Sequence, residues 1–589
     1  MKNIYTEIKN DSAIFKKYWL RFLLLFVSLD LFNQIIVIPL FRWAATYILQ
    51  AGAIPFISYQ NIMTILTTHT LVVIALLLEL VLLILVIYLQ FAFMLVAVRY
   101  INCSLKLILK RTWQAMKHLR FGSLLVLLAY FLLVVPFVDL VFRTPLLAKI
   151  QIPEFILDYM TRNLWLSLAL IAFYLITFIL GIRWIYTLPL MVFNKMKTRQ
   201  AIRQSWQKTK NLNWWKILSI LLVIGIISVI VLVICFGLIY GLQVLCDFLP
   251  KTVSLILANF NLLLVQLVSL LVSVWSSVLA FLFILKNLKI EILTKTNHKN
   301  NGVIAISSVI FVIFAAMSII NNQFYLNGQT LRRPVTISHR GVNNKNGVQN
   351  TIPALKKTAK LHPDFVEIDV HETKDNQFVV MHDENLLKLA GINKMPKDLT
   401  LKQLTQITLH EDNHRAKIAN FDQYLAAAKK LKQRLLIEIK TTPRDSKKII
   451  NRFNKKYGSL ILKRKYQVQS LDYSVIERLH KINPRIFTLY IQPYNFTYPQ
   501  SVADGYSMEY STLNNDFIWQ AHLKHDLVYA WTVNDDKIMR KMMFEGVDGI
   551  ITDNLAGLKE TIHDFEDDHS YSSRLLNYIL VLPQMNTTM

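Results

Sequence analysis

The chain has 589 residues, of which 54% are hydrophobic, and its mean hydropathy is +0.37. These values exclude an ordinary soluble protein of this length. A formal net charge of +27 would suit a polyanion-binding protein, but residues 336–589 hold 35 Lys and Arg against 29 Asp and Glu, so most of the excess lies in the first half.

The first half is a succession of apolar runs, and residues 1–320 are predicted to form a membrane domain. Each run reaches the roughly 18–20 apolar residues that cross a hydrocarbon core. The first run is too long for a signal peptide, and no small-residue cleavage pattern follows it. About seven spans are expected, at 19–41, 71–98, 122–142, 164–190, 217–245, 254–285 and 303–320.

Basic residues alternate between the loops that join these spans. The N-terminal segment and the second, fourth and sixth loops carry 22 Lys and Arg residues, whereas the intervening loops carry five. By the positive-inside bias, the N-terminus is cytoplasmic. An odd number of spans then places the chain after residue 320 outside the cell. We therefore expect a multi-pass protein of the cell membrane, embedded in the lipid bilayer, with an extracellular second domain and no nucleic-acid partner.

Three ionisable residues lie at membrane depth, namely Asp30, Glu79 and Asp139. Such groups are costly in a bilayer and are candidates for function. They have two interpretations: they form hydrogen bonds between helices inside the bundle, or they line a path for lipid or substrate. No pattern of partners such as a proton relay is visible, which favours the first interpretation.

After a linker at 321–334, the chain alternates strand-like runs with helical stretches such as 352–361 and 421–433, and a tail follows at 564–589. This order over 335–563 predicts an α/β (β/α)8 TIM barrel, whose chemistry gathers at the C-terminal ends of the strands. The three cysteines precede this domain, so it folds without a disulfide. The expected strands are 335–339, 365–370, 378–382, 434–440, 466–470, 486–491, 527–533 and 549–552.

Two of these strands carry charged residues on one face. Glu367 and Asp369 are two residues apart, as are Glu438 and Lys440, so the side chains of each pair leave the same side of a strand. Such groups are costly to bury unless they hold a cation or each other. A hard divalent cation on Glu367, Asp369 and Glu438 accounts for the three carboxylates. The alternative is a buried cluster of ion pairs.

Two histidines end predicted strands, His339 the first and His382 the third. Either alone would most often be a structural residue. Together, beside a cluster of carboxylates, they suggest an acid–base pair, because imidazole exchanges a proton near neutral pH. Arg340 and Lys440 add fixed positive charge, which suits an anionic substrate such as a phosphate ester.

The motifs HRG, EID, MHDENL, EIK, WTVND and VDGIITD occur in this order within residues 336–560. In combination they resemble the glycerophosphodiester phosphodiesterase family, and the apolar half is similar to the membrane domain of some bacterial members. The resemblance implies hydrolysis of glycerophosphodiesters to glycerol 3-phosphate and an alcohol. It also implies a calcium or magnesium ion on the three carboxylates, with the two histidines as catalytic residues.

The resemblance extends to the surroundings of the site. Arg340 and Lys440 would bind the substrate phosphate, and Trp531 would contact the glycerol carbons, although Trp531 as barrel core is the alternative. Further side chains expected around the site are Gln349, Asn350, Asp383 and Gln469. We expect the substrate at the outer membrane surface, either a glycerophospholipid head group or a polyglycerol-phosphate polymer.

The sequence departs from the family pattern at two places. The family usually has Glu-Asn-Thr after the first strand, where this chain has Gln349, Asn350 and Thr351, and the helix-ending glycine expected within 520–531 is missing. An amide supplies no negative charge. A membrane protein that binds or senses a phosphodiester without cleaving it is therefore the alternative function. A transporter with an extracellular cap is a third, and would rest on the ionisable residues of the spans.

Overall fold

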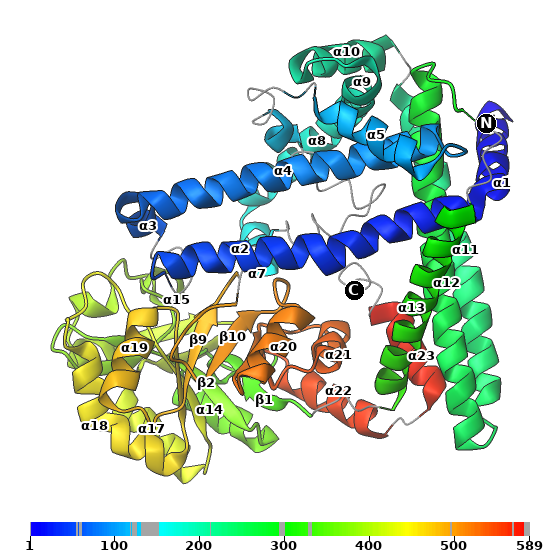
Figure 1. Cartoon of the computed structure of the whole chain (residues 1–589). Coiled ribbons are helices and arrows are strands. Elements are labelled where there is room, and N and C mark those ends of the chain that lie inside the picture. The colour runs from blue at the N-terminus through cyan, green and yellow to red at the C-terminus, as the bar shows by residue number, and fades with distance from the viewer. Residues whose placement is uncertain are drawn as a thin grey trace.

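The structure is a computed structural model in which an α-helical half is followed by an α/β barrel (Figure 1). It describes residues 2–54, 57, 62–117, 119, 126–130, 152–211, 214–293, 301–327, 333–494, 498–567 and 570–581. The predicted fold class, a multi-span helical membrane domain followed by a TIM barrel, is confirmed.

Five helical stretches in the described residues are long and apolar enough to cross a membrane, and they coincide with five of the predicted spans. The predicted span 122–142 lies mostly outside the described residues. The span 303–320 lies within α13 (Asn301–Leu326), a helix of 26 residues. The five stretches are Ile4–Ala51, Thr70–Arg99, Leu164–Asn194, Trp214–Cys246 and Lys251–Asn287.

The long helices pair side by side (Figure 1). The first stretch joins α1 (Lys2–Phe32), the π-helical turn η1 (Asn33–Val37) and α2 (Ile38–Ala51), and α2 contacts α4 (Thr70–Arg99). Large apolar side chains are exposed along α11, which is the pattern of a helix that faces lipid rather than water. The remaining long helices are α8 (Leu164–Trp184), α9 (Thr187–Asn194), α11 (Trp214–Cys246) and α12 (Lys251–Asn287).

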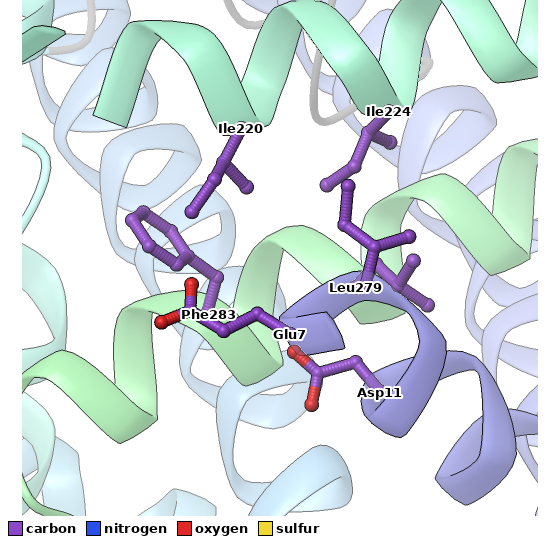
Figure 2. Close-up of a pocket in the computed structure, with 7 residues that line it drawn as sticks. Glu7, Asp11, Ile220, Ile224, Leu279 and Phe283 are labelled. Carbon is purple, nitrogen blue, oxygen red and sulfur yellow. The ribbon is translucent and has the colours of Figure 1, made fainter. Parts of the chain in front are cut away.

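The first turns of α1 are held against α11 and α12 by ion pairs. The Oε1 atom of Glu7 lies 2.7 Å from the Nζ atom of Lys216, and Asp11 pairs with Lys286. The two carboxylates lie beside a small cavity (Figure 2). The other side chains that line this cavity are apolar, namely Ile8, Ile220, Ile224, Leu279 and Phe283. The basic ends of α11 and α12 therefore fix the position of the N-terminal segment.

The ionisable residues predicted at membrane depth lie apart from this cluster. Asp30 on α1 and Glu79 on α4 are half-buried, and Asp139 lies outside the described residues. Within the described chain, neither Asp30 nor Glu79 forms an ion pair. The described helices thus contain no chain of charged partners between these two residues.

Eight parallel strands form the barrel, and it closes because β1 pairs with both β12 and β2. Its interior is filled by a layer of buried side chains that includes Ile337, Phe365, Leu436 and Tyr529. This layer closes the lower part of the barrel, so the polar residues of the next layer lie at the C-terminal mouth. The strands are β1 (Val335–Ser338), β2 (Phe365–Glu372), β7 (Leu435–Ile439), β8 (Gln467–Ser470), β9 (Thr488–Gln492), β10 (Gly505–Glu509), β11 (Leu527–Trp531) and β12 (Gly549–Thr552).

One predicted barrel strand is wrong, and one was missed. The run 378–382 contains β3 (Phe378–Val380), which pairs antiparallel with β2 and with β6 (Ala419–Asn420) outside the barrel. The eighth barrel strand is β10. Its sequence GYSME has no apolar run, because Ser507 and Glu509 take the inward positions where other strands carry apolar residues.

Helices cover the outside of the barrel (Figure 1). At the end of α20, where a glycine was expected, His525 adopts the left-handed backbone conformation with φ of +65°. The small two-stranded sheet of β4 (Thr408–Glu411) and β5 (His414–Lys417) stands apart from the barrel sheet. The main helices are α14 (Ile352–Thr358), α17 (Phe421–Lys430), α18 (Ile449–Arg464), α19 (Tyr473–Ile482), α20 (Asn515–Leu523), α21 (Asp536–Glu545) and α22 (Leu555–Asp567).

Both ends of the barrel segment contact the membrane helices. The first residues of the predicted linker continue α13 as far as Leu326. The predicted tail contains α23 (Tyr571–Val581), which contacts α11 and α12. The hydroxyl of Tyr325 donates to the carbonyl of Arg574 at 2.7 Å, and the Nε2 atom of Gln266 lies 2.9 Å from the hydroxyl of Tyr578. The chain therefore returns to the membrane domain after the barrel.

Candidate active site and metal centre

Three buried carboxylates meet at the mouth of the barrel. Glu367 and Asp369 lie on β2 and Glu438 on β7, where strand register pairs Asp369 with Glu438. One carboxylate oxygen from each residue lies within 4.8 Å of the others. The spacing of two along β2 directs both of its acids to the inside of the barrel. The structure thus brings together the three residues that the sequence nominates as metal ligands.

The electrostatics of this cluster leave negative charge uncompensated. Burial, and then the charges of Asp369 and Glu438, hold the pKa of Glu367 well above its usual value. Burial also raises the pKa of Glu438. Burial acts in the same direction on Asp369, but the charge of Lys440, and then the interactions with His382 and Arg340, outweigh it and lower that pKa. Three oxygen donors with an excess of negative charge fit a hard divalent cation.

Lys440 and Asn350 position the same carboxylates. The Nζ atom of Lys440 lies 2.8 Å from Glu438 Oε1 and 3.3 Å from Asp369 Oδ1. Burial would lower the pKa of Lys440, but these two carboxylates raise it above its usual value. The amide of Asn350 donates to Asp369 Oδ2 at 2.8 Å and accepts from the Asp369 backbone N–H at 3.1 Å. Lys440 therefore stays charged at the centre of the site.

His339 has a hydrogen bond at each ring nitrogen. Its Nδ1 lies 2.8 Å from Asp553 Oδ1, and its Nε2 accepts from Arg340 Nε at 3.1 Å. Burial would raise the pKa of Asp553, but the interaction with His339 dominates and lowers it to about 2. The ionised Asp553 requires a proton on Nδ1, so the Nε2 lone pair faces the site. Arg340 has a φ of +51°, and its backbone N–H donates to Glu367 Oε2 at 2.8 Å.

His382 lies on the segment that follows β3. Its Nδ1 lies 2.7 Å from Asp383 Oδ1, and its backbone carbonyl lies 3.1 Å from the Nε2 atom of His371. Burial lowers the pKa of His382 to about 4, although Asp369 and Asp383 act in the opposite direction. Each of the two histidines therefore has its own carboxylate at Nδ1.

Comparisons with known proteins bear on this arrangement. Residues 339–556 match the glycerophosphoryl diester phosphodiesterase family, and residues 8–322 match the membrane domain of glycerophosphoryl diester phosphodiesterase. The chain belongs to this family. It is 30% identical over 229 residues to YhdW of Bacillus subtilis (strain 168). The aligned region covers 37% of this chain and 93% of YhdW.

Other members are similar over less than half of this chain. A glycerophosphodiester phosphodiesterase of Caldanaerobacter subterraneus subsp. tengcongensis is 26% identical over 235 residues, 38% of this chain and 95% of that protein. A crystal structure of a glycerophosphodiester phosphodiesterase from Parabacteroides distasonis has 25% identity and a TM-score of 0.36, and covers 40% of this chain and 98% of its own. The chain is thus a glycerophosphodiester phosphodiesterase, a phosphoric diester hydrolase with a membrane domain.

The phosphodiesterase has an amide, Gln349, at the position where the resemblance led us to expect a glutamate. Gln349 Oε1 accepts from Arg340 Nη1 at 2.7 Å. The side-chain and backbone N–H groups of Gln349 donate to the two carboxylate oxygens of Glu411, at 2.5 and 2.9 Å. Glu411 ends β4. Glu411 of this hairpin therefore supplies the negative charge that the Gln349 amide lacks. Gln349 lies between this carboxylate and Arg340.

Two more nominated residues lie on inward positions of the phosphodiesterase barrel. Gln469 pairs in register with Glu438, and its Oε1 has no hydrogen-bond partner among the described residues. The Trp531 ring is half-buried, and its Nε1 donates to the carbonyl of Ser507 at 3.0 Å. The ring lies against Phe155 of α7 (Glu154–Thr161), with 6.0 Å between centroids. Trp531 thus lies at the mouth, where the membrane domain meets the barrel.

Four residues around the site had no assigned role from the sequence: Asp553, Glu411, His371 and Glu509. Asp553 directly follows β12, so its position at a strand end was a usable signal. Glu411 lies on a hairpin outside the repeating strand and helix order, and no local pattern connects it to Gln349. Glu509 was missed together with β10.

Proposed function

We propose that this phosphodiesterase cleaves glycerophosphodiesters with a calcium or magnesium ion held by Glu367, Asp369 and Glu438. The products are glycerol 3-phosphate and an alcohol. The observation that carries the proposal is the buried triad, whose oxygens lie within 4.8 Å of one another. When bound, a divalent ion offsets negative charge on the phosphoryl oxygens. Lys440 and Arg340 add fixed positive charge beside the same oxygens.

The two histidines exchange protons with the substrate in this proposal. The neighbouring glycerol hydroxyl attacks phosphorus, one histidine accepts its proton, and the other protonates the departing alkoxide as its P–O bond breaks. A cyclic phosphate and the free alcohol result. Water then opens the ring with the roles of the two histidines reversed. Support comes from the carboxylates at Nδ1 of His339 and His382, which fix each ring and leave Nε2 as the nitrogen that exchanges a proton; in His339 this nitrogen accepts from Arg340 Nε.

The alternative, a barrel that binds a phosphodiester without cleaving it, rested on Gln349. The contacts of Gln349 with Glu411 weaken that alternative, because the amide that contacts Arg340 is itself hydrogen-bonded to a carboxylate. The full-length protein in detergent is expected to release glycerol 3-phosphate from a glycerophosphodiester, and excess chelator is expected to stop the release. Turnover that persists in excess chelator would overturn the metal assignment.

The proposed organisation is a membrane domain at 1–320, a linker at 321–334, the barrel at 335–563 and a tail at 564–589. The loop asymmetry of 22 basic residues against five supports a cytoplasmic N-terminus and an extracellular barrel. Such a barrel would act on lipid head groups or polyglycerol-phosphate polymers at the outer surface, because its attachment keeps it near the bilayer.

Protease accessibility tests this orientation. A protease added to intact protoplasts is expected to remove the chain after residue 335 and to spare the basic loop 191–216. Permeabilised protoplasts, in which both regions are cut, provide the control. Cleavage of the 191–216 loop with protection of the barrel would mean that the number of spans is wrong by one, or that the whole membrane domain is inverted, and that the substrate is cytoplasmic.

A further inference from the structure

Two helices of the membrane domain share one sequence pattern around a tryptophan. Residues 106–117 read KLILKRTWQAMK and lie on α5 (Leu105–Met116) and its C-terminal cap, and residues 199–210 read RQAIRQSWQKTK and lie on α10 (Thr198–Asn211). Each stretch has a basic residue seven and three positions before the tryptophan, a glutamine directly after it and a lysine four positions after it. The intervening residues all differ, so the shared positions need a common explanation.

The basic residues of this pattern and the tryptophan lie on one face of each helix. Steps of four, three and four residues return to the same side of an α-helix. The opposite face packs inward at equivalent positions of the two helices, five and one before the tryptophan, namely Ile108, Thr112, Ala201 and Ser205. The shared face is exposed, including 61% of Trp113 and 41% of Trp206. We call these exposed residues the basic stripes: Lys106, Lys110, Trp113 and Lys117 on α5, and Arg199, Arg203, Trp206 and Lys210 on α10.

The positive charge of the basic stripes is not neutralised by nearby acids. Residues 99–120 and 195–216 contain no aspartate or glutamate. The ion pairs of the described membrane helices involve other basic residues. A further cation, the Arg183 guanidinium, lies 5.5 Å from the centre of the Trp206 ring. Both stripes therefore present positive charge that suits an anionic partner.

Both helices lie at the ends of membrane helices. A short turn joins α4 to α5, and another joins α9 to α10. Both α5 and α10 contact α9, and Figure 1 shows the three helices gathered at one end of the membrane domain, away from the barrel. At the boundary between hydrocarbon and water, an indole ring lies favourably among lipid head groups, and basic side chains bind their phosphates. An exposed tryptophan between basic residues fits this boundary better than it fits water.

We infer that the basic stripes of α5 and α10 are two equivalent binding sites for anionic phospholipids, in the leaflet at that end of the membrane domain. The lysine and arginine side chains bind the lipid phosphate, and the indole ring lies among the head groups. The general bias of basic residues to one side of a membrane accounts for their number, but not for their repeated alignment with a tryptophan. The inference concerns the membrane domain and does not depend on the proposed function of the barrel.

The test measures which lipid surrounds Trp113 and Trp206. The full-length protein is reconstituted in bilayers of equal amounts of phosphatidylglycerol, which is anionic, and phosphatidylcholine, which is zwitterionic. One lipid at a time is brominated, so that it quenches tryptophan fluorescence. Subtracting the signal of the variant Trp113→Phe with Trp206→Phe isolates the fluorescence of these two indoles. Brominated phosphatidylglycerol is expected to quench this difference signal more strongly than brominated phosphatidylcholine.

Two charge-matched variants separate the basic stripes from net charge. Lys110→Gln with Arg203→Gln removes the basic residue three positions before each tryptophan. It is expected to lower the preference for phosphatidylglycerol about fivefold, the contribution of one basic residue near an anionic surface. Arg111→Gln with Lys208→Gln removes the same charge from the same helices, about 100° or more around each helix from the stripe, and is expected to leave the preference unchanged. Both variants are expected to unfold at the wild-type temperature in neutral detergent, because none of the four side chains is buried.

Equal quenching by the two brominated lipids in the wild type would overturn the inference without any further variant. An unchanged preference in Lys110→Gln with Arg203→Gln, or the same fall in Arg111→Gln with Lys208→Gln, would also overturn it. Little quenching by either lipid would place both indoles away from the bilayer and would be equally fatal. If the protein in neutral detergent instead binds single-stranded RNA, loses that binding in Lys110→Gln with Arg203→Gln, and shows no lipid preference, the stripes bind nucleic acid and the inference is wrong.

Discussion

Replacing Asp553 by asparagine would test the role of His339 with a change of one atom. The Nδ2 atom of Asn534 donates to Asp553 Oδ2 at 3.1 Å, and Asn534 Oδ1 accepts from the Asp553 backbone N–H at 2.8 Å, so the Asn534 amide cannot reverse. The new amide must therefore turn its oxygen to Asn534 and its NH2 group to His339 Nδ1. His339 would then carry its proton on Nε2, where it can accept neither from Arg340 nor from the substrate.

The expected cost is the loss of one acid–base group, about 10²- to 10⁴-fold in kcat. At 1.36 kcal/mol per factor of ten, this corresponds to about 2.7–5.4 kcal/mol of activation free energy. The assay is release of glycerol 3-phosphate at saturating metal, with metal affinity measured in parallel and expected to stay near wild type. Asp564→Asn, at an exposed ion pair on α22, is the control. A kcat for Asp553→Asn within a few-fold of the wild type would refute the role assigned to the Nδ1 hydrogen bond.

Three further predictions concern the metal, the histidines and the stability of the barrel. Glu438→Gln is expected to weaken calcium or magnesium binding in calorimetry, because one of three anionic ligands is lost; unchanged affinity would contradict the ligand set. His339→Ala or His382→Ala is expected to lower kcat roughly 10²- to 10⁴-fold, with a double variant no worse than either single one if the two act as a unit. Buried Glu372 has a lowered pKa because hydrogen bonds from Lys397, the backbone of residue 446 and Arg452 outweigh its burial. The contribution of Glu372 to the free energy of unfolding is therefore present at pH 7 and is lost as pH falls below the pKa of the unfolded state, about 4.3. Glu372→Gln should lower the free energy of unfolding by about 2–3 kcal/mol at pH 7 and by progressively less below pH 4, as measured by thermal unfolding.

The metal ligands could be predicted from the sequence because strand geometry acts over a few residues. A spacing of two puts Glu367 and Asp369 on one face, and the parallel strand carrying Glu438 must bring its end to the same mouth. The same reasoning failed at β10. The inward positions of β10 are Ser507 and Glu509, so the inner face of this strand is polar. A search for apolar runs therefore does not detect it.

Contacts between distant parts of the chain had no local signal. Glu411 reaches Gln349 only because the β4 and β5 hairpin folds back over the mouth. Phe155 meets Trp531 across 376 positions of sequence, through a loop between membrane spans. Periodicity identifies which face of an element is buried, but it does not identify which surfaces of two domains meet.

The return of α23 to the membrane helices also has a consequence for how the barrel moves. A domain on a single flexible strand of chain can tumble about that strand, and its mouth samples every direction. Contacts of α13 before the barrel and of α23 after it remove most of this rotational freedom. The entropy of orienting the mouth is therefore lost once, when the protein folds, and not each time the barrel meets a substrate. For a substrate confined to a surface, the local concentration at the mouth then depends on lateral diffusion in two dimensions.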